Sequence, residues 1–194
     1  MQNSTSYWAS NQINVLIGLI IFVFISCKTG TSTVIFHTDF GEMTVDLLPD
    51  IPANLFGQLQ RMTELKGDSI QVAKILHDGF LELGYNAPEN STGNGPALSG
   101  QFVWSEGRFY LIQGRKLTEA DLVKWEKLRG ITIAPGFREL YLKNGGTLQL
   151  GSKCLLLGKL IAGKEVLDRI AALPTDANGR PLQTVRIKPR VGGK

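Results

Sequence analysis

The sequence GKLIAGKEVLDRIAALPTDANGRPLQTVRI, residues 158–187, carries the strongest structural signal in the chain. Together with the preceding CLLL it predicts a strand pair at residues 154–163 that contains a buried apolar run. KEVLDRIAAL has the apolar spacing of a short amphipathic helix, and residues 183–188 predict a closing strand. This half of the chain is therefore expected to be β-structure with one helix between strands.

The region that follows residue 32 has the same character. Residues 33–50 alternate apolar and polar side chains on either side of DFGE, which predicts a hairpin with a glycine-containing turn. Pro52 then begins a pattern in which an apolar residue recurs every three to four positions, up to about residue 65. We expect two antiparallel strands and then a helix that caps one end of a sheet.

The middle of the chain adds strands and one more helix. Residues 71–83 hold short apolar runs broken by HDG, and residues 88–96, PENSTGNGP, consist almost entirely of turn-forming residues. Residues 101–113 predict a hairpin around SEG, and Thr118 begins a helix that ends near Gly130. The whole pattern predicts a mainly antiparallel β-protein with two or three helices, which favours a closed barrel.

The charge pattern argues against nucleic-acid binding. The 21 Lys and Arg residues exceed the 17 Asp and Glu residues, but they are scattered among the acidic ones. A basic cluster occurs only at the C-terminus, where a solubilising tail is favoured over a contact with anionic lipid: Arg186, Lys188, Arg190 and Lys194. The histidines and cysteines have no zinc-ligand spacing, so no metal and no cofactor are expected.

The N-terminal segment has to be considered separately, because the first charged side chain is Lys28. VLIGLIIFVFISC is too short for a spanning helix, which needs about 20 residues, and favours a signal peptide. Its ending FISCK resembles a lipobox, so we expect a signal peptide at 1–26, lipidation of Cys27, a tether at 27–32 and a single domain at 33–194. No Lys or Arg precedes Cys27, which leaves an uncleaved hydrophobic anchor as the alternative.

Three stretches resemble the cyclophilin-type peptidyl-prolyl cis-trans isomerases. Residues 158–187 are similar to the C-terminal end of that family, and VIFHTDFGEMTVDLLPDIPANLFGQL is similar to its opening hairpin and first helix. RFYLIQGRKLTEADLVKWEKLRG resembles exported cyclophilins of Gram-negative bacteria, in which a helical insertion precedes a segment like Gly145-Gly146-Thr147. The resemblance implies a cyclophilin-like closed antiparallel β-barrel capped by two or three helices. The residue after Cys27 is Lys28 and not Asp, and in this the chain resembles lipoproteins that are sorted to the outer membrane.

The resemblance is weak between residues 68 and 105, where the family keeps its chemistry. A Phe-His-Arg motif followed by Phe-Met-x-Gln-Gly-Gly is replaced here by VAKILHDGFLELGY. Lys74 takes the position of the catalytic arginine if one residue is inserted at HDG, and Ile75 takes it otherwise. The resemblance further implies these substrate-binding residues, with Leu83 in the position of the glutamine: Phe80, Leu81, Leu83, Tyr110, Gln149, Leu150 and Cys154.

With these replacements in the family's motif, two functions are expected as alternatives. The first is a peptidyl-prolyl isomerase that assists folding of exported envelope proteins with reduced activity, since lysine lacks the planar donor fork of arginine. The second is a catalytically inactive binding or chaperone lipoprotein, or a subunit of an outer-membrane complex. In both, the partners are proline-containing segments and a membrane reached through the lipid anchor. Binding of a small molecule or polysaccharide near residues 88–96 is a third alternative.

Overall fold

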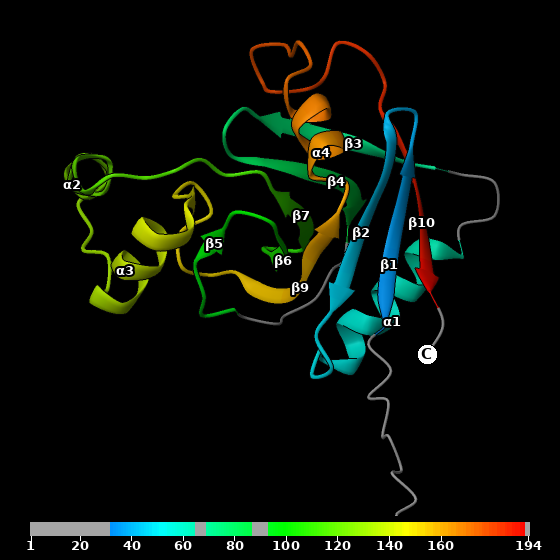
Figure 1. Ribbon diagram of the computed structural model, residues 1–194, viewed down its shortest axis with the longest axis horizontal. Helices are drawn as coiled ribbons and strands as arrows, with labels where there is room; N and C mark the ends of the chain where they lie inside the picture. Colours follow the sequence, from blue (N-terminus) through cyan, green and yellow to red (C-terminus); the bar gives the residue numbers. More distant parts are fainter. Residues whose placement is uncertain (1–31, 65–68, 87–92, 193–194) are drawn as a thin grey trace, which may run out of the picture.

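Eight antiparallel strands close into a barrel in the order β1-β10-β3-β4-β7-β6-β9-β2 (Figure 1). The structure is a computed structural model that describes residues 32–64, 69–86 and 93–192. The predicted signal peptide and Cys27 lie outside the described residues, as does most of the predicted 88–96 loop. The barrel strands are β1 Thr33–Thr38, β2 Gly41–Leu47, β3 Ile70–Leu76, β4 Phe80–Asn86, β6 Gln101–Ser105, β7 Arg108–Ile112, β9 Leu155–Ala162 and β10 Arg186–Gly192.

The predicted hairpins are present. β1 pairs with β2 from Thr33↔Asp46 to Thr38↔Gly41, so the turn falls at Asp39-Phe40. Within this hairpin, period-two alternation turns every second side chain toward the barrel interior. β6 and β7 form the second predicted hairpin around Glu106-Gly107, and β3 and β4 form a third that turns at HDG.

Two amphipathic helices cover the ends of the barrel. Helix α1, Ala53–Thr63, buries Leu55, Leu59 and Met62 in the main core. Helix α4, Lys164–Ala171, buries Val166, Leu167, Ile170 and Ala171 in the same core. Figure 1 shows α4 and α1 near opposite ends of the barrel. Both helices were expected from the spacing of their apolar residues.

Two predictions near the C-terminus need correction. Residues 154–163 were expected to form a strand pair, but they contain the single strand β9, which pairs with β2 on one side and β6 on the other. The closing strand β10 begins at Arg186, three residues later than the predicted start at residue 183. β10 pairs with β1 from Thr38↔Ile187 to Thr33↔Gly192, and this pairing closes the barrel.

The insertion between β7 and β9 contains two helices, of which only one was predicted. Helix α2, Glu119–Arg129, begins with a capping box between Thr118 and Asp121, and helix α3, Pro135–Asn144, was not expected. The described part of the chain therefore has four helices rather than two or three. The insertion has a core of its own, built on Leu117, Leu122, Tyr141 and Leu148. The strands β5, Ala97–Leu98, and β8, Gly146–Thr147, pair at its base.

Side chains fill the barrel interior. Phe102 stacks on Phe109 with ring centroids 5.7 Å apart and contacts Phe36 edge-on at 5.4 Å. All three rings are fully buried, and burying such a side chain contributes about 1.5–3 kcal/mol. Any ligand therefore has to bind outside the barrel wall. Among the described residues, no helix is long and apolar enough to cross a membrane.

Candidate functional site

A second apolar cluster lies apart from the barrel core, on the outer side of neighbouring strands. It comprises the buried residues Phe80, Ala97, Val103, Tyr110, Ile112 and Cys154, with Leu76, Leu150 and Leu156 packed against them. Strand pairing explains this composition, because Phe80 lies opposite Ile112, and Tyr110 lies opposite Val103. Directly opposed residues of antiparallel strands share one face of a sheet. We refer to these nine residues as the outer cluster.

Phe80 and Tyr110 form the centre of the outer cluster. Their ring centroids are 5.1 Å apart with an interplanar angle of 81°, a favourable edge-to-face geometry. Each residue is 6% exposed. Burial raises the pKa of the Tyr110 phenol to about 12, and the nearby negative charge of Glu82 adds to the effect. The phenol is therefore neutral at physiological pH and keeps its proton as a hydrogen-bond donor.

A row of polar residues crosses the same face beside the outer cluster. Lys74 on β3 lies opposite Glu82 on β4, which in turn lies opposite Tyr110 on β7. The pairing places all three on the outer face. The aliphatic part of Lys74 runs beside Gly179, where an added Cβ would lie 3.1 Å from Lys74 Cγ. The row brings a cation and a carboxylate to the edge of an apolar surface.

Glu82 is held by an arginine from the neighbouring strand. Arg108 Nη1 donates a hydrogen bond to Glu82 Oε1 at 2.6 Å. The Glu82 side chain is 13% exposed and that of Arg108 is 42% exposed, so the carboxylate is the more deeply placed partner. A pair of this kind is stronger than a hydrogen bond between neutral groups.

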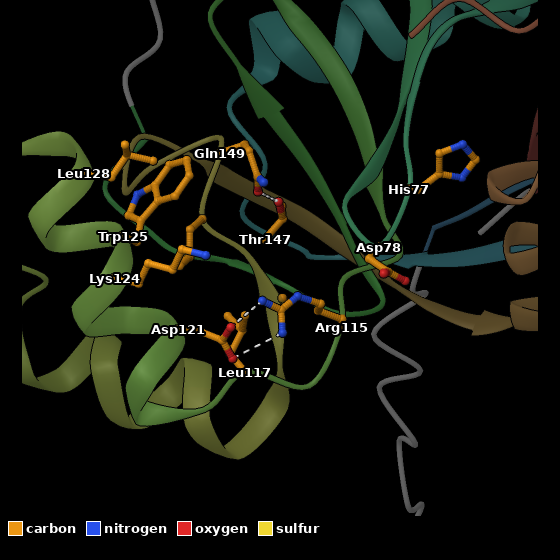
Figure 2. A pocket seen from close by; sticks show the side chains of 12 residues that line it. His77, Asp78, Arg115, Leu117, Asp121, Lys124, Trp125, Leu128, Thr147 and Gln149 are labelled. Atoms are coloured by element: carbon orange, nitrogen blue, oxygen red, sulfur yellow. Dashed lines mark hydrogen bonds and ion pairs between the residues drawn. The ribbon is translucent and has the colours of Figure 1, made fainter. Parts of the chain in front are cut away.

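The remaining predicted site residues separate into two groups. Cys154 is buried in the outer cluster, where burial raises the pKa of its thiol to about 11, and Leu150 packs against the same cluster. Gln149 instead is exposed, and its amide oxygen accepts a hydrogen bond from the Thr147 hydroxyl. It lines a neighbouring cavity between the barrel and α2 (Figure 2). The structure thus brings Phe80, Tyr110, Leu150 and Cys154 together and leaves Gln149 outside.

Comparison with known proteins identifies the architecture. No protein-family model and no curated protein matches this sequence. Among solved structures, a cyclophilin type peptidyl-prolyl cis-trans isomerase from Cryptosporidium parvum superposes with a TM-score of 0.53 at 12% identity, over 84% of this chain and 99% of that chain. A second structure of the same isomerase, determined in the presence of the dipeptide ala-pro, gives a TM-score of 0.53 at 13% identity with the same coverage. The chain has the cyclophilin fold.

Within this cyclophilin fold, the candidate positions for the arginine can be compared directly. Ile75 is 2% exposed and belongs to the barrel core, opposite Leu81. Lys74 lies on the outer face, the side that carries Phe80 and Tyr110. The register shift of this hairpin lies between Val72 and Lys74 and not at HDG, where the interpretation with Lys74 places its inserted residue, so the shift does not test that insertion.

The predicted contacts of Leu81 and Leu83 with substrate are not supported by the structure. Both residues are fully buried in the barrel core. Counting along the sequence placed Leu83 in the position of the family's glutamine. Strand alternation instead turns Glu82 to the outer face, because β4 carries Phe80 on that face and side chains repeat with period two. A shift of one residue moves a side chain to the other side of the sheet.

Glu82 and Arg108 are therefore site residues that the sequence reasoning missed. The signal was available, since Glu82 follows Phe80 by two positions and Arg108 precedes Tyr110 by two. No group of three potential metal ligands occurs within residues 32–64, 69–86 and 93–192. The side chains assembled here offer an apolar surface, one lysine and a carboxylate held by arginine. This set suits binding of an apolar side chain with a polar backbone beside it.

Proposed function

We propose that this chain is a cyclophilin-type domain that binds proline-containing segments and isomerises X-Pro bonds slowly. The contact between Phe80 and Tyr110 on the outer face, next to Lys74, is the observation that carries the proposal. The fold supports it, and a solved structure with the same fold was determined in the presence of ala-pro. The outer cluster would receive the prolyl ring, while Lys74 lies at the edge where the substrate backbone would pass.

The expected chemistry requires neither a nucleophile nor a metal. Rotation about a peptide bond has a barrier of about 18–20 kcal/mol because resonance keeps the amide planar. A cation that donates a hydrogen bond to the twisted prolyl nitrogen stabilises the transition state more than the planar ground state. The Lys74 ammonium would supply such a donor, but as a single hydrated point charge and not as the planar fork of a guanidinium.

Two features of the site explain why turnover would be slow. Glu82 offers only acceptors to a substrate backbone, and its carboxylate already accepts a hydrogen bond from Arg108. Phe80 and Tyr110 are almost completely buried by their neighbours, so a prolyl ring reaches them only after side chains move. Binding energy used for this movement is lost to catalysis.

A coupled proline-isomerisation assay tests the proposal. The purified full chain should accelerate isomerisation of an Ala-Pro peptide above the uncatalysed rate, and Lys74→Ala should remove most of that acceleration. Lys188→Ala is the matched control, because Lys188 is an exposed lysine on β10, away from the outer cluster. A wild-type chain no faster than buffer would rule out isomerase activity. Equal rates for wild type and Lys74→Ala would exclude Lys74 from catalysis.

A non-catalytic binding domain is the second candidate function. The burial of the outer cluster favours it, since a closed apolar surface with a lysine in place of arginine is poorly suited to turnover. Under this alternative the chain would bind proline-containing peptides without accelerating their isomerisation. Calorimetric titration with the same Ala-Pro peptide separates the cases, because binding without rate enhancement supports only the second.

The cellular setting is a separate part of the proposal. A lipid attached to Cys27 would tether the domain to the outer membrane of a Gram-negative bacterium, where its clients would be exported proteins or subunits of an outer-membrane complex. The apolar run that ends at Cys27 supports this. Replacing Cys27 with Ser should abolish incorporation of labelled fatty acid and release the chain from the membrane fraction. Unchanged labelling of Cys27→Ser would contradict lipidation at this residue.

A further inference from the structure

Three hollows adjoin one another at the α2–α3 insertion, and all three share Trp125 and Leu148 in their walls. Their volumes are about 360, 130 and 400 Å³. The first lies between α2 and the segment that carries Thr147 and Gln149, as Figure 2 shows. The smallest lies against α3 and is lined mainly by apolar side chains, among them Phe137. We call the three together the insertion groove.

The insertion groove also exposes apolar residues to solvent. Leu128 in the first hollow is 71% exposed, and Ile131 in the other two is 48% exposed. Exposed apolar side chains gathered along a groove are typical of a surface that binds another chain. Trp125 lies between them and is only partly buried. An indole that lines all three hollows can act as the anchor of such a contact.

When the ion pairs within the insertion groove are set aside, positive charges outnumber negative ones along it. Asp121 is bound by Arg115 at 2.6 Å, and Glu106 lies 3.9 Å from Lys153. Two cations remain beside Trp125 without a carboxylate partner in the described part of the chain, Lys124 and Arg129. Lys124 lines the first hollow, whereas Arg129 lines the third and lies 4.8 Å above the Trp125 ring.

One carboxylate lacks an ion-pair partner among the described residues at the groove, that of Asp78. It lies across the first hollow from α2, at the turn between β3 and β4 (Figure 2). Trp125 therefore lines the small apolar hollow and shares each of the two larger hollows with one cation that has no ion-pair partner among the described residues, Lys124 in the first and Arg129 in the third. An extended chain places alternate side chains about 6.5–7 Å apart, so one apolar residue with acidic residues two positions before and after it would fit this arrangement.

We propose that the insertion groove binds an extended segment of another protein, in which an apolar residue is flanked by acidic residues. The apolar side chain would contact Trp125 and enter the small hollow beside α3, and the two carboxylates would approach Lys124 and Arg129. The N-terminal segment of the chain itself does not match, because residues 1–31 contain no Asp or Glu. The charge of the groove thus selects an acidic partner.

The insertion groove reaches the candidate site. Leu150 lines the third hollow and also packs against the outer cluster. A bound segment could therefore continue from the groove toward Phe80 and Tyr110. The inference rests on the proposed function only where it regards the bound segment as a client protein. A ligand without proline tests binding to the groove separately from isomerase activity.

Fluorescence titration of the full chain provides the test. The probe is an acetylated, amidated peptide of sequence Ser-Glu-Ser-Phe-Ser-Glu-Ser. The chain contains Trp8, Trp104 and Trp125, and Trp104 is 3% exposed, so a change in emission that disappears in Trp125→Phe reports on the groove. We expect saturable binding that weakens as salt is added, because the charges involved are exposed.

Matched peptides and variants decide the outcome. Replacing both glutamates of the peptide with glutamine, or Lys124 and Arg129 with Gln in the protein, should weaken binding by roughly fivefold or more. Lys188→Gln should leave it unchanged, because Lys188 is on the far strand β10. Equal binding of a peptide with lysines in place of the glutamates would overturn the proposal. So would absence of binding at about 1 mM peptide, or concentration-dependent self-association that Trp125→Ala abolishes.

Discussion

Arg108 and Glu82 form an ion pair across β7 and β4, with 2.6 Å between Arg108 Nη1 and Glu82 Oε1. The carboxylate lies opposite Tyr110 on one side and Lys74 on the other. The pair therefore determines what the polar side of the outer cluster offers a ligand. With its carboxylate bound to Arg108, Glu82 presents acceptors only, and Lys74 lies beside an anion whose charge is already partly balanced.

The outer face can be altered to test whether its polar residues limit turnover. Changing Lys74→Arg together with Glu82→Gln should raise kcat/KM for an Ala-Pro peptide by about tenfold or more, since the guanidinium donates two parallel hydrogen bonds and the amide both donates and accepts. Lys74→Arg alone should gain less, because a guanidinium opposite Glu82 would pair with it. A double variant no faster than the single one would contradict this account.

The resemblance to the family places glutamine at position 83. Because Leu83 lies in the interior, however, we expect Leu83→Gln to destabilise the chain and not to improve its activity. Leu83→Gln places an amide in the fully buried barrel core. It should lower the free energy of unfolding by about 2–4 kcal/mol, because the amide loses its water and the core loses an apolar side chain. Urea denaturation measures this, with Asn86→Gln at an exposed position of the same strand as the control. A loss below about 0.5 kcal/mol would argue against the interior placement of Leu83.

Much of the fold could be predicted because its local signals are strong. The β1–β2 and β6–β7 hairpins follow from alternation around glycine-containing turns, and α2 follows from Thr118 at its start and Gly130 at its end. Helix α3 was missed because its N-cap position, Ala134, provides no side-chain hydrogen bond and only Tyr141 is buried along its length. Its packing against α2 across Trp125 and Phe137 is a tertiary effect that no local pattern contains.

The candidate site was harder to predict because it depends on strand register. Phe80 and Tyr110 were found by resemblance and meet in the structure, whereas Leu83 lies in the barrel core and not on the outer face. The pairing shift between Val72 and Lys74 is an irregularity that a sequence does not display. The insertion groove was missed for a similar reason, since the exposure of Leu128 depends on how α2 docks.

The start of α2 offers a local test of stability. The Thr118 hydroxyl accepts a hydrogen bond from the Asp121 amide, while the Asp121 carboxylate accepts one from the Thr118 amide at 2.8 Å. Thr118→Ala should lower the free energy of unfolding by about 1 kcal/mol and speed hydrogen exchange in the first turn of α2 several-fold. The hydrogen bond from Arg115 holds the pKa of Asp121 well below its usual range, so the remaining cap should persist into acid. Unchanged exchange in Thr118→Ala would show that packing alone fixes this helix.

The buried thiol of Cys154 makes a prediction for alkaline pH. Burial raises its pKa to about 11 in the folded chain, above the ordinary value of the unfolded chain, so the folded state holds this proton more tightly. The resulting stability is fully present below about pH 9 and is lost as the pH rises toward 11. Between about pH 8 and about pH 10, we expect the thiol to account for a loss of about 1 kcal/mol in the free energy of unfolding. Tyr110 and Tyr141, with pKa values raised to about 12, contribute mainly at higher pH.

Urea denaturation of the reduced protein at about pH 8 and about pH 10 measures the loss that the Cys154 thiol causes. Cys154→Ala should be less stable at both, since it leaves a cavity in the outer cluster, but its stability should change less between them. A decline of equal size in both proteins would mean that other groups cause it.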